Sequence, residues 1–125
     1  MGAVLVVDDE PDLRSSIVTV LRDAGFEVIE ASDGRDAIPI LRDQDIDLLV
    51  TDLVMPGTEG IELVRLLAGK ASRPAIIVMS AHHGEARGDY LELAGKLGAD
   101  RTLKKPFKAK ELLDAVQQVM ATKPA

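Results

Sequence analysis

The sequence predicts an α/β fold: a doubly wound, five-stranded parallel sheet in the strand order 2-1-3-4-5, with helices on both faces. Short apolar runs typical of strands alternate with helical periods along the chain, and parallel strands need such helical crossovers. The first, third and fourth runs are uniformly apolar, as central strands covered on both faces must be. The second and fifth runs are short and polar, so we place them at the edges of the sheet.

The first expected strand is the apolar run at residues 3–7, and a helix follows it. Proline suits the first helical position, so we expect this helix to begin at Pro11. Apolar residues then recur at helical spacing until Gly25, which ends the helix. The second strand is short and contains residues 28–29, which lie between two glutamates.

The middle of the chain predicts a helix, a strand and a further helix. Asp33 is expected to cap the second helix, and Pro39 falls inside that helix and should kink or shorten it. Residues 48–51 form the third expected strand. Apolar residues at helical spacing over residues 61–67 predict the third helix.

The last part of the chain completes the alternation. Residues 75–79 predict the fourth strand, and residues 91–97 a fourth helix that glycine interrupts. A short polar fifth strand is expected at residues 101–103, and a fifth helix around residues 112–119. We expect residues 121–125 to form a flexible tail.

Length and composition favour one domain that spans residues 1–125. The chain is 46% hydrophobic and 29% charged, which is typical of globular proteins. It contains no cysteine and no apolar run of membrane-spanning length, so we expect a cytoplasmic protein with no membrane segment. A net charge of -6 and an aromatic content of 2% provide neither a basic face nor a stacking surface, so we expect no direct nucleic-acid binding.

Polar residues follow the expected strands at one edge of the sheet, where ligands bind in this fold class. Asp8 and Asp9 follow the first strand, Asp52 closes the third, Ser80 closes the fourth, and a Lys-Lys pair ending at Lys105 follows the fifth. One capping aspartate would not predict the other residues. Together they predict a single functional site.

Three carboxylates at one edge repel one another unless a cation or a proton lies among them. The sequence offers oxygen ligands there and no cysteine, so the cation should be hard: Mg²⁺ first, with Mn²⁺ as a substitute. An aspartate can attack a phosphoryl group when the metal, an ammonium and a hydroxyl neutralise or bind its oxygens. Asp52 is the candidate nucleophile, with a lysine and Ser80 as the phosphoryl contacts.

Four motifs carry a family resemblance. They are VVDDEP at residues 6–11, TDLVMPGTEG at 51–60, VMSA at 78–81 and LKKPF at 103–107. The motifs stand in the order, and at nearly the spacing, that they have in the response-regulator receiver domains of bacterial two-component signalling, the CheY-like superfamily. The chain resembles that family. The resemblance covers essentially the whole chain and implies a (βα)5 flavodoxin-like fold.

The resemblance implies roles for the acidic residues. Asp52 would accept a phosphoryl group from a histidine kinase or a histidine phosphotransfer protein. Asp9 and Asp52 would ligate Mg²⁺ together with the backbone carbonyl of Val54, and Asp8 would help through water. The protein would be a signalling switch that catalyses only its own phosphorylation and slow autodephosphorylation, not a conventional enzyme.

The resemblance also implies how the signal leaves the site. Ser80 would be the switch hydroxyl, and Lys105 the phosphate contact, because it precedes the proline of a cis Lys105-Pro106 bond. The face formed by the fourth helix, fifth strand and fifth helix would signal to a downstream protein or a covalently linked output domain. We expect a monomer or a weak homodimer.

One segment and three residues depart from the family pattern or invite a hypothesis. Thr102 stands where the family has an aromatic switch residue, so an aromatic rotamer switch cannot operate as usual. The segment after Ser80 is about three residues longer than usual, and we expect a mobile loop at residues 81–89. We hypothesise that His82 and Val54, each two residues past a site residue, tune the lifetime of the phosphoryl group.

Two other functions stay open. A pseudo-receiver that only binds partners would lose members of the acidic pocket, whereas this chain keeps them. An aspartyl-phosphate phosphatase of the haloacid-dehalogenase type would need a second aspartate two residues after Asp52, where this sequence has Val54.

Overall fold

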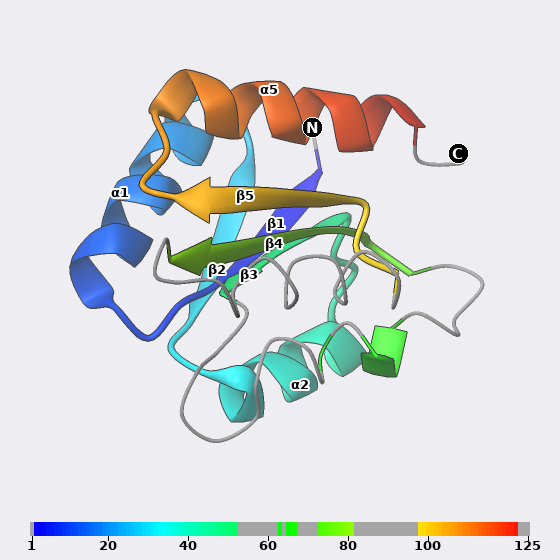
Figure 1. The fold of residues 1–125 in the computed structure, drawn as a ribbon. Helices are drawn as coiled ribbons and strands as arrows, with labels where there is room; N and C mark the ends of the chain where they lie inside the picture. The colour runs from blue at the N-terminus through cyan, green and yellow to red at the C-terminus, as the bar shows by residue number, and fades with distance from the viewer. Residues whose placement is uncertain (1, 53–62, 64, 68–72, 82–97, 123–125) are drawn as a thin grey trace.

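A computed structural model describes residues 2–52, 63, 65–67, 73–81 and 98–122. Within these residues the chain forms one sheet in the order β2-β1-β3-β4-β5, and every neighbouring pair of strands is parallel. The fold class and the strand order predicted from the sequence are therefore confirmed. Figure 1 shows the sheet between two layers of helix, with α1 and α5 on one side and α2 on the other.

Apart from β1, which has the expected bounds, the strands extend further toward the functional edge than their apolar residues indicate. The bounds are β1 (Ala3–Val7), β2 (Glu27–Ala31), β3 (Leu48–Asp52), β4 (Ala75–Ala81) and β5 (Arg101–Lys105). In the register, Asp52 lies opposite Met79, and Ser80 lies opposite Lys104. Backbone pairing does not depend on side-chain polarity, so these strands continue through the polar residues that close them.

The helices begin and end close to the positions that their sequence signals indicate. They are α1 (Pro11–Asp23), α2 (Gly34–Asp43) and α5 (Ala109–Thr122). Asp33 caps α2, because its Oδ1 atom accepts a hydrogen bond from the Asp36 N–H at 2.9 Å. Gly25, just beyond α1, has a φ of 99°, which glycine adopts without steric cost. Helix α2 runs through Pro39 to Asp43.

Some expected elements lie wholly or partly outside the described residues. Residues 63 and 65–67 are helical, as expected for the third helix. The expected fourth helix and most of the expected loop at residues 81–89 lie outside the described residues. Residues 121 and 122, expected in the tail, belong to α5.

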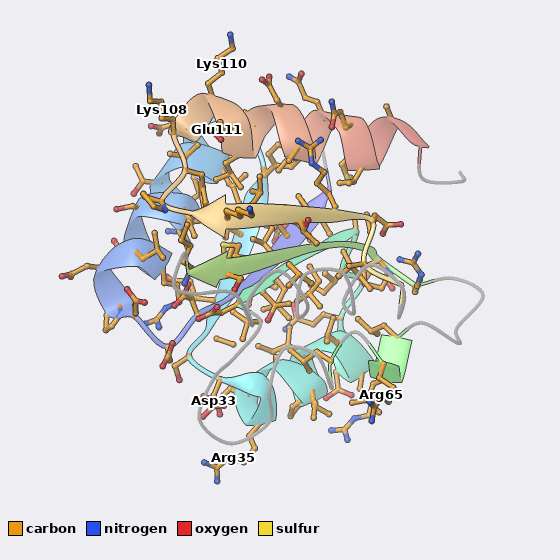
Figure 2. The ribbon with its side chains drawn as sticks, in the orientation of Figure 1. Asp33, Arg35, Arg65, Lys108, Lys110 and Glu111 are labelled. Atoms are coloured by element: carbon orange, nitrogen blue, oxygen red, sulfur yellow. The ribbon has the colours of Figure 1, made fainter. Side chains whose placement is uncertain are left out.

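Two buried clusters hold the helices on the sheet. Leu103 of β5 shares one cluster with Leu112 and Val116 of α5 and with residues of α1. Ala37 of α2 and Leu63 lie in the other, on the opposite face of the sheet. The outer faces of the helices are charged: Figure 2 shows the exposed side chains of Lys110 on α5 and Arg35 on α2 pointing away from the sheet. Among the described residues, none of the helices has the length and apolar character that a membrane crossing requires.

Two aspartates tie strands together at the edge of the sheet where the strands begin. Asp47 accepts a hydrogen bond from the Ala3 N–H at 2.9 Å, and its own N–H donates to the Ala3 carbonyl at 2.9 Å. Asp100 does the same for Ile76, with both bonds at 2.8 Å. The guanidinium of Arg73 holds the Asp100 carboxylate with two bonds, at 2.9 and 3.1 Å. The end of the sheet opposite the polar residues is thus firmly tied.

Candidate functional site

The ammonium of Lys105 lies among three carboxylates at the carboxyl edge of the sheet. Its Nζ atom is 3.1 Å from Asp8 Oδ2, 3.3 Å from Asp52 Oδ2 and 3.9 Å from Glu10 Oε1. Asp8 is 0% exposed, and Asp52 and Lys105 are each 8% exposed. Buried charged groups stay ionised when an opposite charge lies beside them. Here the Lys105 ammonium pairs with the buried carboxylates of both Asp8 and Asp52.

Strand alternation explains why Lys105, and not Lys104, enters the site. Successive side chains of a strand point to opposite faces. Lys105 is two residues past Leu103, which is buried, whereas Lys104 between them is exposed. By the same alternation, Asp52 continues the side of β3 that carries the buried Val50. The structure thus brings Asp52 and Lys105 together from strands that are not neighbours.

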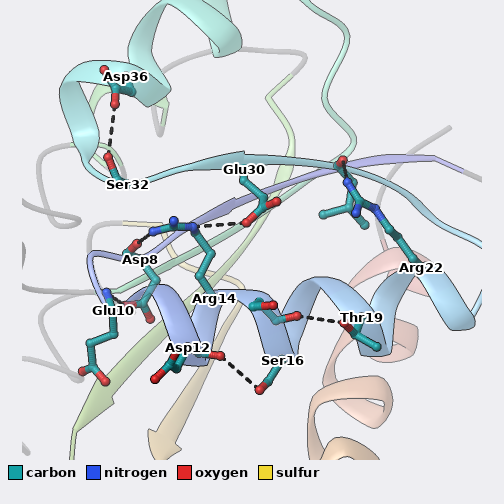
Figure 3. Close-up of polar contacts among 12 residues, drawn as sticks. Asp8, Glu10, Asp12, Arg14, Ser16, Thr19, Arg22, Glu30, Ser32 and Asp36 are labelled. Atoms are coloured by element: carbon teal, nitrogen blue, oxygen red, sulfur yellow. Dashed lines mark hydrogen bonds and ion pairs between the residues drawn. The ribbon is translucent and has the colours of Figure 1, made fainter.

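Asp8 is held by hydrogen bonds on its side chain and on its backbone. Its Oδ1 atom accepts the Glu10 N–H at 2.9 Å, and its own N–H donates to the Ala31 carbonyl at 3.2 Å. The Asp8 carbonyl accepts a hydrogen bond from Arg14 Nη1 at 2.6 Å. Figure 3 shows Arg14 reaching from α1 toward both Asp8 and Glu30. The turn after β1 is therefore fixed from α1 and from β2.

Asp8, Asp9 and Asp52 form a group that could hold a metal ion. Each offers one carboxylate oxygen, and these oxygens all lie within 4.8 Å of one another. Around Mg²⁺, ligand oxygens at about 2.1 Å from the metal are separated by about 3 to 4 Å. The donor set, carboxylates only, and its spacing therefore fit Mg²⁺. Asp9 is exposed, so one side of the group faces solvent.

The charge state of Lys105 follows from its neighbours. Burial lowers the pKa of its ammonium, but the negative charge of Asp52 and the charge and hydrogen bond of Asp8 outweigh burial and raise the pKa above 10.5. Lys105 is therefore a cation throughout the neutral range. It can neutralise an anionic group that enters beside Asp52.

The other residues expected in the site are placed as follows. Ser80 is buried on β4, between the strands that carry Asp52 and Lys105. Thr102 is half-buried on β5 and lies opposite Val78 of β4. The expected cis bond between Lys105 and Pro106 is present. Val54 and His82 lie outside the described residues.

Sequence reasoning missed two residues that support the site. Thr51 Oγ1 donates a buried hydrogen bond to the carbonyl of Asp52 at 3.0 Å. Arg14 holds the carbonyl of Asp8. Their positions carried no signal, because a threonine in a strand and an arginine on an amphipathic helix are both common. Their hydrogen-bond partners are backbone atoms, which a sequence pattern does not reveal.

The chain matches a family model and curated relatives over most of its length. Residues 4–117 match the model of the response regulator receiver domain. The transcriptional regulatory protein CpxR of Escherichia coli is 37% identical over 96% of this chain, and the match covers 50% of CpxR. The chain thus spans about half the length of CpxR. The chemotaxis protein CheY of Pseudomonas aeruginosa is 34% identical, and the match covers 93% of this chain and 94% of CheY.

Solved structures agree with these relatives. The chemotaxis response regulator CheY4 of Vibrio cholerae superposes with a TM-score of 0.84 at 30% identity, covering 95% of this chain and 98% of CheY4. The fold and the sequence of this chain thus both match those of receiver domains over most of its length. The chain belongs to the family of response regulator receiver domains, the CheY-like signalling switches of two-component systems.

Proposed function

We propose that Asp52 is the phosphoacceptor of a two-component phosphorelay and that its phosphorylation depends on Mg²⁺. The donor is a histidine kinase or a histidine phosphotransfer protein. One observation carries the proposal: Lys105 Nζ lies 3.3 Å from Asp52 Oδ2, and Asp52 belongs to a cluster of three carboxylates whose spacing fits Mg²⁺. A phosphoryl group that enters here meets a nucleophile and a fixed cation in a single site.

The neighbours of each carboxylate favour Asp52 as the nucleophile. Both oxygens of Asp8 have partners, the Glu10 N–H and the Lys105 ammonium, and the residue has no exposed surface. Asp9 follows the strand and is exposed. Asp52 ends the central strand β3 and keeps a small exposed fraction. Its backbone is fixed while its side chain can be reached from the edge of the sheet.

The transfer forms one bond and breaks one bond. An oxygen of Asp52 attacks phosphorus, and the bond from phosphorus to the donor nitrogen breaks. The electron pair of that bond stays on the imidazole nitrogen of the donor, which gains the proton needed for neutrality. The product is an aspartyl phosphate.

Residues around Asp52 support the transferred group. The ammonium of Lys105 neutralises one phosphoryl oxygen, and the hydroxyl of Ser80 donates a hydrogen bond to another. Asp8, Asp9 and Asp52, with the Val54 carbonyl, would hold Mg²⁺, which neutralises negative charge on a phosphoryl oxygen. Mn²⁺, a hard cation with the same preference for oxygen, would substitute.

Signalling would follow from the change of partner at Lys105. Once Asp52 is phosphorylated, the ammonium has a new anion to bind, and Lys105 is the last residue of β5. Strand β5 packs on α5 through Leu103. We infer that the expected fourth helix, β5 and α5 form the surface that signals to a downstream protein or linked output domain. With Thr102 in place of an aromatic residue, this readout would rely on rearrangement of the loop and the expected fourth helix or on a different reader.

Incubation with Mg²⁺ and acetyl phosphate, followed by intact mass measurement, tests the proposal. We expect one phosphoryl adduct on the wild type, its loss on chelation of Mg²⁺, and no adduct on Asp52→Asn. Asp45→Asn, an exposed aspartate just before the start of β3 and thus at the opposite end of that strand from Asp52, is the matched control and should behave as wild type. An adduct that survives in Asp52→Asn would overturn the assignment of the nucleophile. No adduct on the wild type would favour the pseudo-receiver.

A further inference from the structure

Arg14 links three parts of the structure next to the proposed metal site. It lies on α1, its Nη1 atom donates to the Asp8 carbonyl at 2.6 Å, and its Nε atom lies 3.2 Å from Glu30 Oε1 on β2. Its side chain is 19% exposed, and that of Glu30 is 40% exposed. Figure 3 shows the guanidinium between the two acceptors. Glu30 orients the guanidinium, and the guanidinium holds the turn.

The acceptor on Asp8 is what connects Arg14 to the metal donors. The carbonyl of Asp8 belongs to the planar peptide unit that joins Asp8 to Asp9. A hydrogen bond to this oxygen restrains the orientation of that unit, which joins the backbone positions of the two side chains. Asp8 and Asp9 supply two of the three clustered carboxylates. Arg14 therefore acts on the spacing of the donors without being one of them.

Resting on the proposed function, we propose that Arg14 is a positioning residue that sets the Mg²⁺ affinity of the site. Residues that orient metal ligands often change metal affinity by tenfold or more when they are replaced. Glu30 is its partner in this role, because it fixes the rotation of the guanidinium about its long side chain. Loss of Glu30 should have a smaller effect in the same direction.

The direction in which Mg²⁺ affinity changes when Arg14 is replaced distinguishes a positioning role from an electrostatic one. A guanidinium near a cation site repels the cation, so a purely electrostatic role predicts tighter Mg²⁺ binding when Arg14 is removed. Positioning predicts weaker binding. A purely structural role predicts lower stability with unchanged affinity.

Helix α1 provides a matched control in Arg22. Arg22, like Arg14, donates to a backbone carbonyl. Its acceptor is the Val28 carbonyl of β2, at 3.2 Å, and Arg22 lies in the last turn of α1. Arg22→Met therefore removes an arginine link between α1 and β2 away from the acidic residues. Arg14→Lys keeps the charge and loses the planar fork.

The test is titration of Mg²⁺ into the metal-free proteins, followed by calorimetry. We expect Arg14→Met to weaken Mg²⁺ binding about tenfold, Arg14→Lys and Glu30→Gln to weaken it less, and Arg22→Met to leave it unchanged. Phosphorylation of Arg14→Met by acetyl phosphate should regain most of the wild-type rate at saturating Mg²⁺. Far-ultraviolet circular dichroism confirms folding, and Arg14→Lys and Glu30→Gln carry the test if Arg14→Met does not fold.

Each outcome decides the inference. Unchanged or tighter Mg²⁺ binding in Arg14→Met, or in both milder variants, overturns the positioning role while leaving the proposed function intact. An equal loss in Arg22→Met shows a general effect of helix α1 and also overturns it. A wild type that binds no Mg²⁺ contradicts the proposed function itself, and the inference falls with it.

Discussion

Lys105 and Asp8 are 97 residues apart in the sequence, yet Lys105 Nζ lies 3.1 Å from Asp8 Oδ2. They come from β5 and from the end of β1, which are three strand positions apart in the sheet. That separation is about 14 Å between backbones, so the two side chains reach toward each other across the ends of β3 and β4. The ion pair spans the sheet directly beside Asp52.

Lys105→Met should destabilise the metal-free protein by about 3 kcal/mol. The substitution leaves Asp8 and Asp52 buried without the cation that both contact, and an unpaired buried charge is costly. Unfolding in urea, with Mg²⁺ chelated, measures the change. Lys104→Met is the matched control, because Lys104 is the exposed neighbour on the same strand, and its effect should stay within about 0.5 kcal/mol. Equal effects of the two substitutions would contradict the ion-pair geometry.

The contribution of Lys105 to stability should disappear at alkaline pH. A group whose pKa is raised by folding stabilises the folded state fully below its unfolded value, here the ordinary 10.5. That stabilisation is lost as the pH rises through the raised folded pKa. The difference in unfolding free energy between wild type and Lys105→Met should therefore be constant up to about pH 9 and shrink above 10.5. A difference that grows with pH would have the wrong sign.

Asp9→Asn should stabilise the metal-free protein and remove its response to Mg²⁺. Asp9 adds a third carboxylate to the group that includes Asp8 and Asp52, so its neutralisation relieves repulsion. In the wild type, Mg²⁺ at one hundred times its dissociation constant should add about 2.7 kcal/mol of stability. Thermal unfolding with and without Mg²⁺ measures both effects, and Asp45→Asn should show neither. A variant that keeps the full response to Mg²⁺ would remove Asp9 from the ligand set.

His82→Ala should change the rate at which the aspartyl phosphate hydrolyses severalfold. His82 is two residues past Ser80 in the sequence, and an imidazole near the phosphoryl group can bind or exclude the attacking water. The phosphorylated protein, freed of acetyl phosphate, is followed by intact mass over time. His83→Ala serves as the control, because adjacent side chains diverge. An unchanged rate in His82→Ala removes His82 from the site.

The sequence predicted the sheet and the gathering of polar residues at one of its edges because both depend on local patterns. Apolar runs set the strands, and the rule that ligands bind beyond parallel strand ends gathered Asp8, Asp52 and Lys105 at one edge. The strands predicted from the sequence end too early, since backbone pairing continues into polar residues such as Ser80. Residues 121 and 122 were expected in a tail, although α5 includes them.

The contacts by which Arg14 supports the site could not be predicted from the sequence. The partners of Arg14 are a carbonyl six residues away and a carboxylate on another strand. Such contacts follow from how α1 packs on the sheet and not from the spacing of residue types. The choice between Lys104 and Lys105 came from the resemblance, and the alternation of β5 gives its physical reason.

The hydrogen bonds of Asp47 and Asp100 tie the starts of four strands, β1 with β3 and β4 with β5. These bonds hold two pairs of neighbouring strands together where the strands begin. If Asp52 is phosphorylated as proposed, the added charge lies at the opposite end of the sheet from these hydrogen bonds. We expect these hydrogen bonds to keep the strands in register when the charge at Asp52 changes.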